Sequence, residues 1–315
     1  MKTHSIAIIG VGKIAQDQHL PVIGKDERFR LAALVSQRGI KFPGVPTFRT
    51  AAELYAAMPD LEAVALCMPP SARRKEALEA LAAGKHVLME KPPTPTVTEL
   101  NDIIAQAAAA KCVLFTTWHS QYNAAVEEAR RRLAGQKLKS FTIIWKEDVR
   151  RWHPGQEWIW QGGGFGVFDP GINALSVLTR IMPAQVFVTD AELVTPTNRD
   201  TPIAASLSFS CPDAAASPES RFTAEFDWRQ EGEQTWTITL ETAEGTVLTL
   251  VDGGSKLDVD GKRIVEAELQ EYERIYERFA GMLDSGESLI DAAPFHLVAD
   301  AFLVGKRVPT DPFDW

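Results

Sequence analysis

The sequence predicts an α/β protein: an N-terminal Rossmann domain with a doubly wound parallel sheet, followed by an α/β domain with a large, open, mostly antiparallel sheet. Two observations support this prediction. Up to about residue 120, short apolar runs alternate with helical patterns, as in βαβ units. Beyond that point, the runs alternate apolar and polar residues, as do strands with one covered face. We therefore predict an NAD(P)-binding domain over residues 1–120 and a substrate-binding and oligomerisation domain over residues 121–315.

The first region contains five strand candidates and two helix patterns. The strand candidates are continuously apolar, which is typical of strands buried on both faces. They are SIAIIG (5–10), LAALVS (31–36), AVALCM (63–68), HVLMEK (86–91) and VLFTTW (113–118). The helix patterns cover residues 71–84 and 96–111, and we expect the first to begin with Ser71 as its N-cap and to stop at Gly84.

The second region begins with a helical pattern at residues 124–135. In residues 221–228, and likewise in 235–242 and 245–252, apolar and polar side chains alternate, which predicts half-buried strands. Two further helices are predicted at residues 268–286 and 295–308, and the C-terminal helix could pack back on the first domain.

Composition excludes several classes of protein. Hydrophobic residues make up 45% and charged residues 24% of the chain, as in ordinary globular proteins, and a net charge of −9 without a basic stripe argues against nucleic-acid binding. No apolar run has the length of a membrane span, and no signal-peptide pattern is visible. The three widely spaced cysteines predict buried, reduced thiols in a cytoplasmic protein, and the six scattered histidines predict no metal site.

A glycine-rich turn follows the first strand. Gly10-x-Gly12-x-x-Ala15 suits a dinucleotide site, because Gly10 allows a tight turn, Gly12 lets the backbone approach a pyrophosphate, and Ala15 lets helix and strand pack closely. Such a match is weak by itself, but its place at the start of a βαβ series makes it specific. We predict that Gly10, Gly12, Lys13 and Ile14 contact the cofactor.

The second strand ends in Ser36, Gln37 and Arg38, where an acidic residue would bind the ribose 2′-hydroxyl of NAD. A serine and an arginine can hold a 2′-phosphate instead. The cofactor is therefore predicted to be NADP or NAD, with NADP favoured. The alternative is that Arg38 is a solvated loop residue.

A second motif, Glu90-Lys91-Pro92, ends the fifth strand, at the edge where open α/β sheets bind ligands. On pattern alone, Lys91 would be a surface turn residue. Together with GVGKIA, MPP and the Asp-x-x-x-Asn of DPGIN, this motif resembles the Gfo/Idh/MocA oxidoreductase family over essentially the whole chain. The longer segments KEDVRRWHPGQEWIW, TWHSQ and GVFDPGINALS resemble its bacterial L-arabinose and D-galactose 1-dehydrogenases.

The resemblance implies oxidation of an aldopyranose, L-arabinose or D-galactose, at C1 to the lactone, with hydride passing to the nicotinamide. It assigns Lys91, Asp169 and Asn173 to catalysis. It also implies cofactor contacts at the following residues: Met68, Pro69, Glu90, Lys91 and His119.

The stretch from 146 to 173 is rich in tryptophan, carboxylates and glycine, which suits a sugar: an aromatic ring covers the C–H face and polar groups bind the hydroxyls. The predicted substrate contacts are His119, Glu147, Trp152, His153 and Trp228. Each has an ordinary alternative, since tryptophans are more often core residues, a histidine can hold a loop, and Glu147 can be a solvated charge. Trp158 and Trp160 would point oppositely if the chain there were extended.

The DPGIN segment has two interpretations. The pattern alone favours Asp169 as an N-cap with proline at the first helical position, and Asn173 lies on the same helix face. The resemblance instead makes Asp169 the proton acceptor, Asn173 a group that orients the C1 hydroxyl, and Lys91 the group that stabilises developing negative charge. Lys91 is the alternative base.

Three other functions fit the same fold: an inositol or other polyol dehydrogenase, an NAD-dependent glycosidase, and a non-catalytic NADP-binding sensor. A sensor would not need Lys91, Asp169 and Asn173 together, and all three are present. The predicted partner is a small-molecule sugar, with no nucleic acid or membrane, and the open sheet is compatible with a dimer, a tetramer or a monomer.

Overall fold

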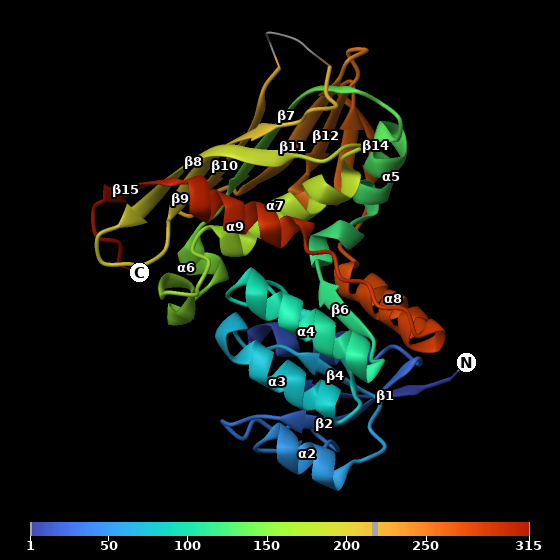
Figure 1. The fold of residues 1–315 in the computed structure, drawn as a ribbon. Coiled ribbons are helices and arrows are strands. Elements are labelled where there is room, and N and C mark those ends of the chain that lie inside the picture. Colours follow the sequence, from blue (N-terminus) through green and yellow to red (C-terminus); the bar gives the residue numbers. More distant parts are fainter. Residues whose placement is uncertain (1, 216–219, 315) are drawn as a thin grey trace. The chain divides into compact units, whose positions relative to one another are not determined.

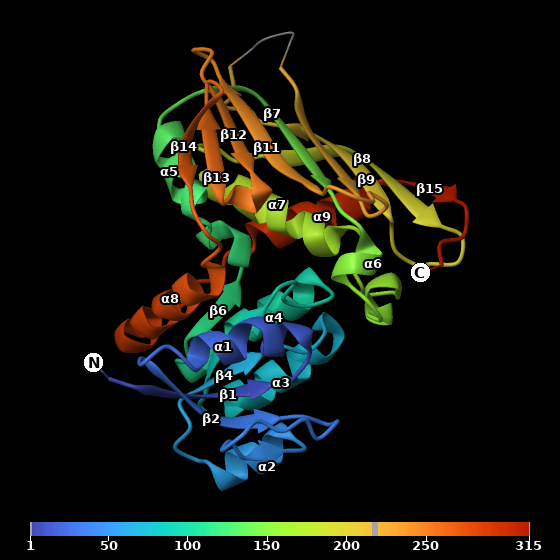
Figure 2. The ribbon, with the colours of Figure 1, turned by 180° about the vertical axis from the view of Figure 1, so that it is seen from behind.

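The computed structural model describes residues 2–215 and 220–314, which form two compact units. One unit extends to Trp118 and also takes in Tyr272–Asp291. The other comprises His119–Glu271 and the chain from Ala292 onward. Figures 1 and 2 show the elements of each unit from opposite sides.

The first unit is built on a parallel sheet of six strands in the order β3-β2-β1-β4-β5-β6. The predicted apolar runs form its five longer strands, which confirms the Rossmann topology. The strands are β1 (His4–Ile9), β2 (Phe29–Val35), β3 (Thr47–Phe48), β4 (Ala63–Leu66), β5 (His86–Glu90) and β6 (Leu114–Thr117). Their central residues are fully buried because helices cover both faces of the sheet.

Two of the helices of this unit begin at a threonine whose side chain caps them. The helices of the unit are η1 (Ala15–His19), α1 (Leu20–Ile23), α2 (Ala51–Ala57), α3 (Pro70–Ala82) and α4 (Val97–Ala110). The Thr96 side chain caps α4 by accepting from the Glu99 N–H. The prediction of Ser71 as the N-cap of α3 is wrong, because the helix begins at Pro70, whose missing N–H costs nothing in the first turn. Gly84 follows the end of α3 with φ +69°, as predicted for a C-terminal glycine.

Helix α8 (Glu271–Ser285) brings a distant segment into the first unit. Its Phe279 stacks on Phe29 of β2 and on Phe115 of β6, with ring centroids 6.0 and 6.2 Å apart. Tyr272 and Tyr276 of the same helix are buried. The core of the first unit therefore depends on residues far along the chain.

The second unit is built on a mixed sheet of nine strands in the order β14-β13-β12-β11-β7-β10-β9-β8-β15. Only the β10–β7 and β15–β8 pairs are parallel, so the sheet is mostly antiparallel, as predicted. The strands are β7 (Leu138–Lys146), β8 (Phe187–Pro196), β9 (Ala204–Ser210), β10 (Phe222–Asp227), β11 (Thr235–Thr242), β12 (Val247–Val251), β13 (Lys256–Val259), β14 (Lys262–Glu266) and β15 (Lys306–Thr310).

One face of this sheet is covered by helices. Helices α7 and α9 lie side by side along it in both views (Figures 1 and 2). The helices and turns of the unit are η2 (His119–Tyr122), α5 (Ala124–Leu133), α6 (Val149–Trp152), η3 (Glu157–Trp160), α7 (Phe168–Ile181), η4 (Asp252–Gly254) and α9 (Ala293–Val304). In β10, Ala224 and Phe226 are buried and Glu225 is exposed, which confirms the alternating pattern.

The predicted helix at 295–308 is partly wrong, because α9 ends at Val304 and Lys306–Thr310 forms strand β15. The break falls at Gly305, where a Cβ atom would lie 2.4 Å from the Ala301 carbonyl oxygen and 2.9 Å from the Leu193 side chain. The glycine thus lets the chain turn tightly and pair with β8.

Two predictions concerning the environment of the chain can be compared with this structure. All three cysteines are free and buried, as predicted. Within residues 2–215 and 220–314, no helix combines the length and the apolar character that crossing a membrane requires.

Gly171 fixes how closely α7 approaches the sheet. A Cβ atom there would lie 3.0 Å from the ring of Phe226, which is itself buried against Phe168. Because Phe226 is buried, an added Cβ atom would have to displace a packed ring, and glycine lets the first turns of α7 pack closely on β10. This contact positions the helix that carries Asp169 and Asn173.

We expect Gly171→Ala to destabilise the protein, because overpacking that costs about 1–3 kcal/mol outweighs a gain in helix propensity of about 1 kcal/mol. Gly281→Ala in α8 is the matched control, since nothing lies within 4 Å of its Cβ position, and it should stabilise. Urea unfolding measures both. Equal stabilisation by the two substitutions would contradict the packing argument.

Candidate active site

The glycine turn after β1 has the geometry that a dinucleotide requires. Gly10 has φ +89°, and a Cβ atom there would lie 2.8 Å from the backbone nitrogen of Met68, so the position admits only glycine. At Gly12 a Cβ atom would meet nothing within 4 Å, so the turn leaves open space beside its backbone. The residues therefore fit a bound pyrophosphate. Lys13 is exposed and pairs with Asp17, and Ile14 is half-buried.

The loop after β2 contains the residues predicted to face the ribose. The Ser36 hydroxyl oxygen accepts a hydrogen bond from the Ile40 N–H at 3.1 Å, whereas Gln37 and Arg38 are exposed. Arg49, just after β3, donates to the Gln37 carbonyl at 2.5 Å. A second arginine, from the segment after β3, is thus bonded to this loop. The sequence analysis missed it because β3 has only two residues and leaves little pattern.

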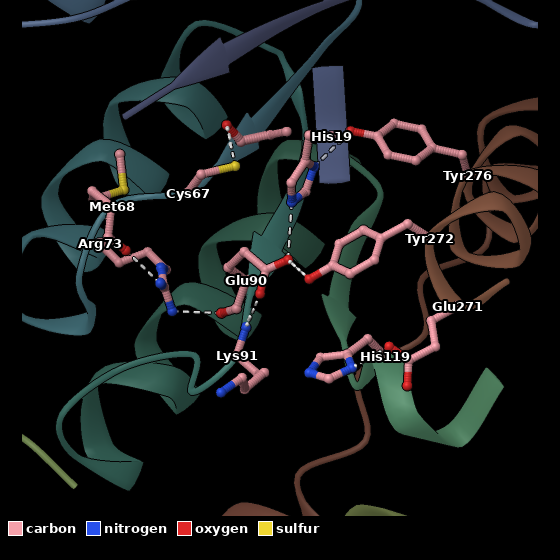
Figure 3. Close-up of polar contacts among 11 residues, drawn as sticks. His19, Cys67, Met68, Arg73, Glu90, Lys91, His119, Glu271, Tyr272 and Tyr276 are labelled. Atoms are coloured by element: carbon pink, nitrogen blue, oxygen red, sulfur yellow. Dashed lines mark hydrogen bonds and ion pairs between the residues drawn. The ribbon is translucent and has the colours of Figure 1, made fainter. Parts of the chain in front are cut away.

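The strand ends β4 and β5 are held together by a buried arginine from α3. The Arg73 guanidinium donates to the backbone carbonyls of Met68 and Glu90 (Figure 3). It also donates to the carbonyl of Pro92. It therefore fixes the backbone of both predicted cofactor segments, 68–69 and 90–92. Arg73 was not predicted, since in the sequence it is one of several charged residues of an ordinary helix. The Lys91–Pro92 peptide is cis, and Lys91 is half-buried.

A histidine lies between two buried carboxylates in the second unit. Glu147 follows β7, His153 follows α6, and Asp169 is in the first turn of α7. His153 Nε2 is 3.7 Å from a Glu147 oxygen, and its Nδ1 is 3.6 Å from an Asp169 oxygen. The Glu147 and Asp169 residues are only 5% and 3% exposed, so their charges are poorly solvated, and a protonated imidazole between them would stabilise both. The structure thus brings three of the predicted site residues together.

Asp169 is not an N-cap. Helix α7 begins at Phe168 with Val167 in the cap position, so the capping interpretation of DPGIN is wrong. Asn173 lies one turn further on the same face. Its Oδ1 and the Nδ1 of His153 are buried and have no hydrogen-bond partner among the described residues. Buried polar atoms are almost always paired, so these two are suited to receive the hydroxyls of a ligand.

Among the tryptophans of the described residues, one is exposed, two are half-buried and four are buried. Trp152 is 37% exposed, its indole N–H donates to Gln234 at 3.3 Å, and its ring meets Trp236 edge-on at 5.4 Å. Trp236 also donates its indole N–H to Glu147 at 2.9 Å. Trp236 and Gln234 were not predicted, because β11 reads as an ordinary alternating strand.

Trp228 is part of the core of the second unit. It is fully buried, and it packs against His153 and Trp160 with centroids 5.3 and 5.1 Å apart. It therefore supports His153 from behind, and its role as a sugar contact stays a prediction. Trp158 and Trp160 lie in the helical turn η3, not in an extended segment, and Trp160 is buried.

His119 begins the second unit, where it pairs with Glu271. Its Nδ1 lies 2.8 Å from a Glu271 oxygen, and the Asn123 amide donates to the other oxygen at 2.7 Å. Burial by itself raises the pKa of Glu271, but the interactions with His119, Asn123 and Ser120 outweigh it and hold the pKa below its ordinary value. The carboxylate therefore fixes the orientation of the His119 ring.

The comparisons with known proteins give the class of protein and then the family. Residues 4–118 match the family described as "Oxidoreductase family, NAD-binding Rossmann fold". The chain is 43% identical to galactose 1-dehydrogenase of Pseudomonas fluorescens, over 99% of both chains. It is 49% identical to the crystal structure of D-galactose-1-dehydrogenase from Rhizobium etli, with a TM-score of 0.93 and coverage of 100% and 99% of the two chains.

The 3-ketoreductase KijD10 of Actinomadura kijaniata, crystallised with TDP-benzene and NADP, shares 17% identity at a TM-score of 0.83 over 98% and 100% of the chains, which shows a common fold. The protein is thus an oxidoreductase with an NAD(P)-binding Rossmann fold. It belongs to the Gfo/Idh/MocA family, as a homologue of galactose 1-dehydrogenase.

We expect Glu271→Gln to change the pH dependence of stability. Because the pKa of Glu271 is lowered on folding, its carboxylate stabilises the native state above the unfolded pKa of about 4.3, and this contribution disappears as the pH falls through the folded pKa. The difference in free energy of unfolding between wild type and variant should shrink with acidification, as followed by urea unfolding at several pH values. Glu273→Gln, at an exposed position of the same helix, controls for the loss of a surface charge. A difference independent of pH would refute the pairing.

Proposed function

We propose that this protein oxidises D-galactose, and L-arabinose as a second substrate, at C1 to the lactone with NAD(P). The observation that carries the proposal is its similarity to two galactose 1-dehydrogenases over the whole chain, together with the Glu147, His153 and Asp169 cluster in the second unit. A bound nicotinamide supplies the hydride acceptor. The protein must bind the sugar and take the proton from the C1 hydroxyl.

Asp169 is the proposed proton acceptor. Its carboxylate is buried and lies within ion-pair distance of His153, which can stabilise its charge. Asn173, one turn along α7, is the proposed group that orients the C1 hydroxyl, since its buried Oδ1 has no hydrogen-bond partner within the described residues. Lys91 is the proposed source of positive charge for the developing C1 oxyanion, and it is the alternative base.

The remaining polar groups are proposed to recognise the sugar hydroxyls. The Nδ1 of His153 makes no hydrogen bond within the described chain, Glu147 is held by Trp236, and His119 is held by Glu271. The exposed ring of Trp152 is the proposed cover for the sugar's C–H face. L-arabinose is D-galactose without its hydroxymethyl group. One group of this size changes kcat/KM by only about 10–200-fold, so we propose that one pocket accepts both sugars.

NADP is the proposed preferred cofactor. Ser36 and Arg38 replace the acidic residue that binds the ribose 2′-hydroxyl of NAD, and Arg49, which follows β3, is bonded to this loop at the Gln37 carbonyl. The two guanidinium groups suit a 2′-phosphate. NAD lacks this phosphate and is proposed to bind more weakly.

The buried free cysteines support a cytoplasmic location. The face of the nine-stranded sheet opposite α7 and α9 is the proposed surface for a homodimer or tetramer.

A panel of substrates distinguishes this function from its alternatives. We expect reduction of NADP with D-galactose and L-arabinose, and none with inositol or aryl galactosides, as followed by the ultraviolet absorbance of the reduced nicotinamide. A ketone product would indicate a polyol dehydrogenase, sugar release from a glycoside would indicate a glycosidase, and cofactor binding without turnover would indicate a sensor.

In the same assay, Lys91→Ala and Asp169→Asn should each lower kcat by at least about 100-fold, the scale of lost acid–base catalysis. Near-normal turnover in either variant would remove that residue from the mechanism.

We expect Arg38→Ala to raise KM for NADP by about tenfold while leaving KM for NAD unchanged, because it removes an exposed charged contact to the 2′-phosphate alone. Arg49→Ala should act in the same direction. Arg30→Ala, an exposed arginine at the start of β2, is the control. Steady-state kinetics with both cofactors measure the effect, and equal changes for NAD and NADP would contradict it.

A further inference from the structure

The carboxylate of Glu90 is buried behind the Lys91 backbone and binds three other groups. Glu90 is 3% exposed. Its Oε1 accepts from the Tyr272 hydroxyl at 2.8 Å and lies 2.9 Å from His19 Nε2, and its Oε2 accepts from the Lys91 N–H at 3.1 Å (Figure 3). The side chain of Glu90 thus connects the segment bearing Lys91 with η1 and α8.

His19 is the ionisable partner in this group. It is fully buried at the end of η1, and its second nitrogen, Nδ1, lies 2.8 Å from the Tyr276 hydroxyl. The rings of Tyr272 and Tyr276 meet the imidazole edge-on, with centroids 5.0 and 5.8 Å away. Four side chains from three segments therefore form one continuous network, none of which belongs to the site described above except Glu90.

The network favours a charged pair of His19 and Glu90. Burial by itself lowers the pKa of His19, but its interactions with Cys67, Tyr276 and Glu90 outweigh burial and raise the pKa well above the usual range. Burial raises the pKa of Tyr276 to about 12, so its hydroxyl stays neutral. A hydroxyl can donate to a neutral imidazole or accept from an imidazolium, so it suits either state. An imidazolium neutralises Glu90, whose charge would otherwise act on the neighbouring lysine.

We propose that His19, Tyr272 and Glu90 are positioning residues for Lys91: His19 and Tyr272 fix the Glu90 carboxylate and His19 neutralises it, so that Glu90 holds the Lys91 backbone without attracting its ammonium. The proposal rests on the role of Lys91 in the proposed function. Without His19, Glu90 would be an unbalanced buried anion. It would then attract the adjacent ammonium, raise the pKa of the Lys91 amine, and withdraw it from the sugar.

The test combines four variants and two independent readouts. The variants are His19→Gln, Tyr272→Phe, the double variant His19→Gln with Glu90→Gln, and Tyr55→Phe as a control. Tyr55 is a good match for Tyr272, because its hydroxyl is buried but has no hydrogen-bond partner in the described chain. The readouts are kcat and KM with D-galactose and NADP, and the pKa of Lys91 from the pH dependence of its acetylation by acetic anhydride, followed by peptide mass spectrometry.

We expect His19→Gln to lower kcat by about 100-fold, the cost of misplacing a reacting group by about 1 Å, with a smaller change in KM. The pKa of Lys91 should rise in this variant. The double variant should regain much of the lost kcat and return the Lys91 pKa toward wild type, because the unbalanced charge is gone. Tyr272→Phe should lower kcat in the same direction, and Tyr55→Phe should change neither readout.

A merely structural role predicts otherwise. The kcat of the double variant would then be no higher than that of His19→Gln, and the pKa of Lys91 would be the same in all variants. This result would overturn the proposal. If His19→Gln does not fold, as judged by thermal unfolding, Tyr272→Phe against Tyr55→Phe carries the test. If the wild type oxidises no sugar, the proposed function fails, but the titration of Lys91 still reports whether the network controls it.

Discussion

The site in the first unit depends on one constraint, the burial of the Glu90 carboxylate. Moving a carboxylate out of water costs several kcal/mol unless hydrogen bonds and an opposite charge replace the lost solvation. The protein meets this need from three directions, with His19 from η1, Tyr272 from α8 and the N–H of Lys91 itself. Because none of these contacts can form unless the segments are folded together, the end of β5 is ordered by the whole unit.

In the second unit, the close packing of a helix on the sheet positions the polar site residues. Helix α7 can carry Asp169 and Asn173 against the sheet only because Gly171 leaves room for Phe226. Glu147 and His153 then reach Asp169 from the loops that follow β7 and α6. Rigid packing at one contact therefore sets the distances among polar groups that lie on less regular backbone, where binding residues are commonly found.

The fold by itself would leave the chemistry open, since the same architecture occurs at 17% identity in a 3-ketoreductase. The side chains of the second unit limit the reactions that the site can support. They include two buried carboxylates around one imidazole, an amide one helical turn away, and an exposed indole nearby in the sequence. The tryptophan side chains of the second unit have two different roles. Trp152 remains exposed, whereas Trp228 and Trp236 hold His153 and Glu147 in place.

The sequence by itself determined the βαβ order of the first unit, the glycine turn and the half-buried strands of the second, because hydrophobic period and glycine geometry are local properties. The composition of residues 146–173 also predicted Glu147 and His153 as site residues, and the family resemblance added Asp169. Only the tertiary structure decided that Arg73 holds two loops, that Trp228 is buried, that residues 306–310 form a strand, and that Tyr272 reaches Glu90 across 182 positions. Such contacts arise between segments that meet only after folding, so no periodicity or spacing along the chain predicts them.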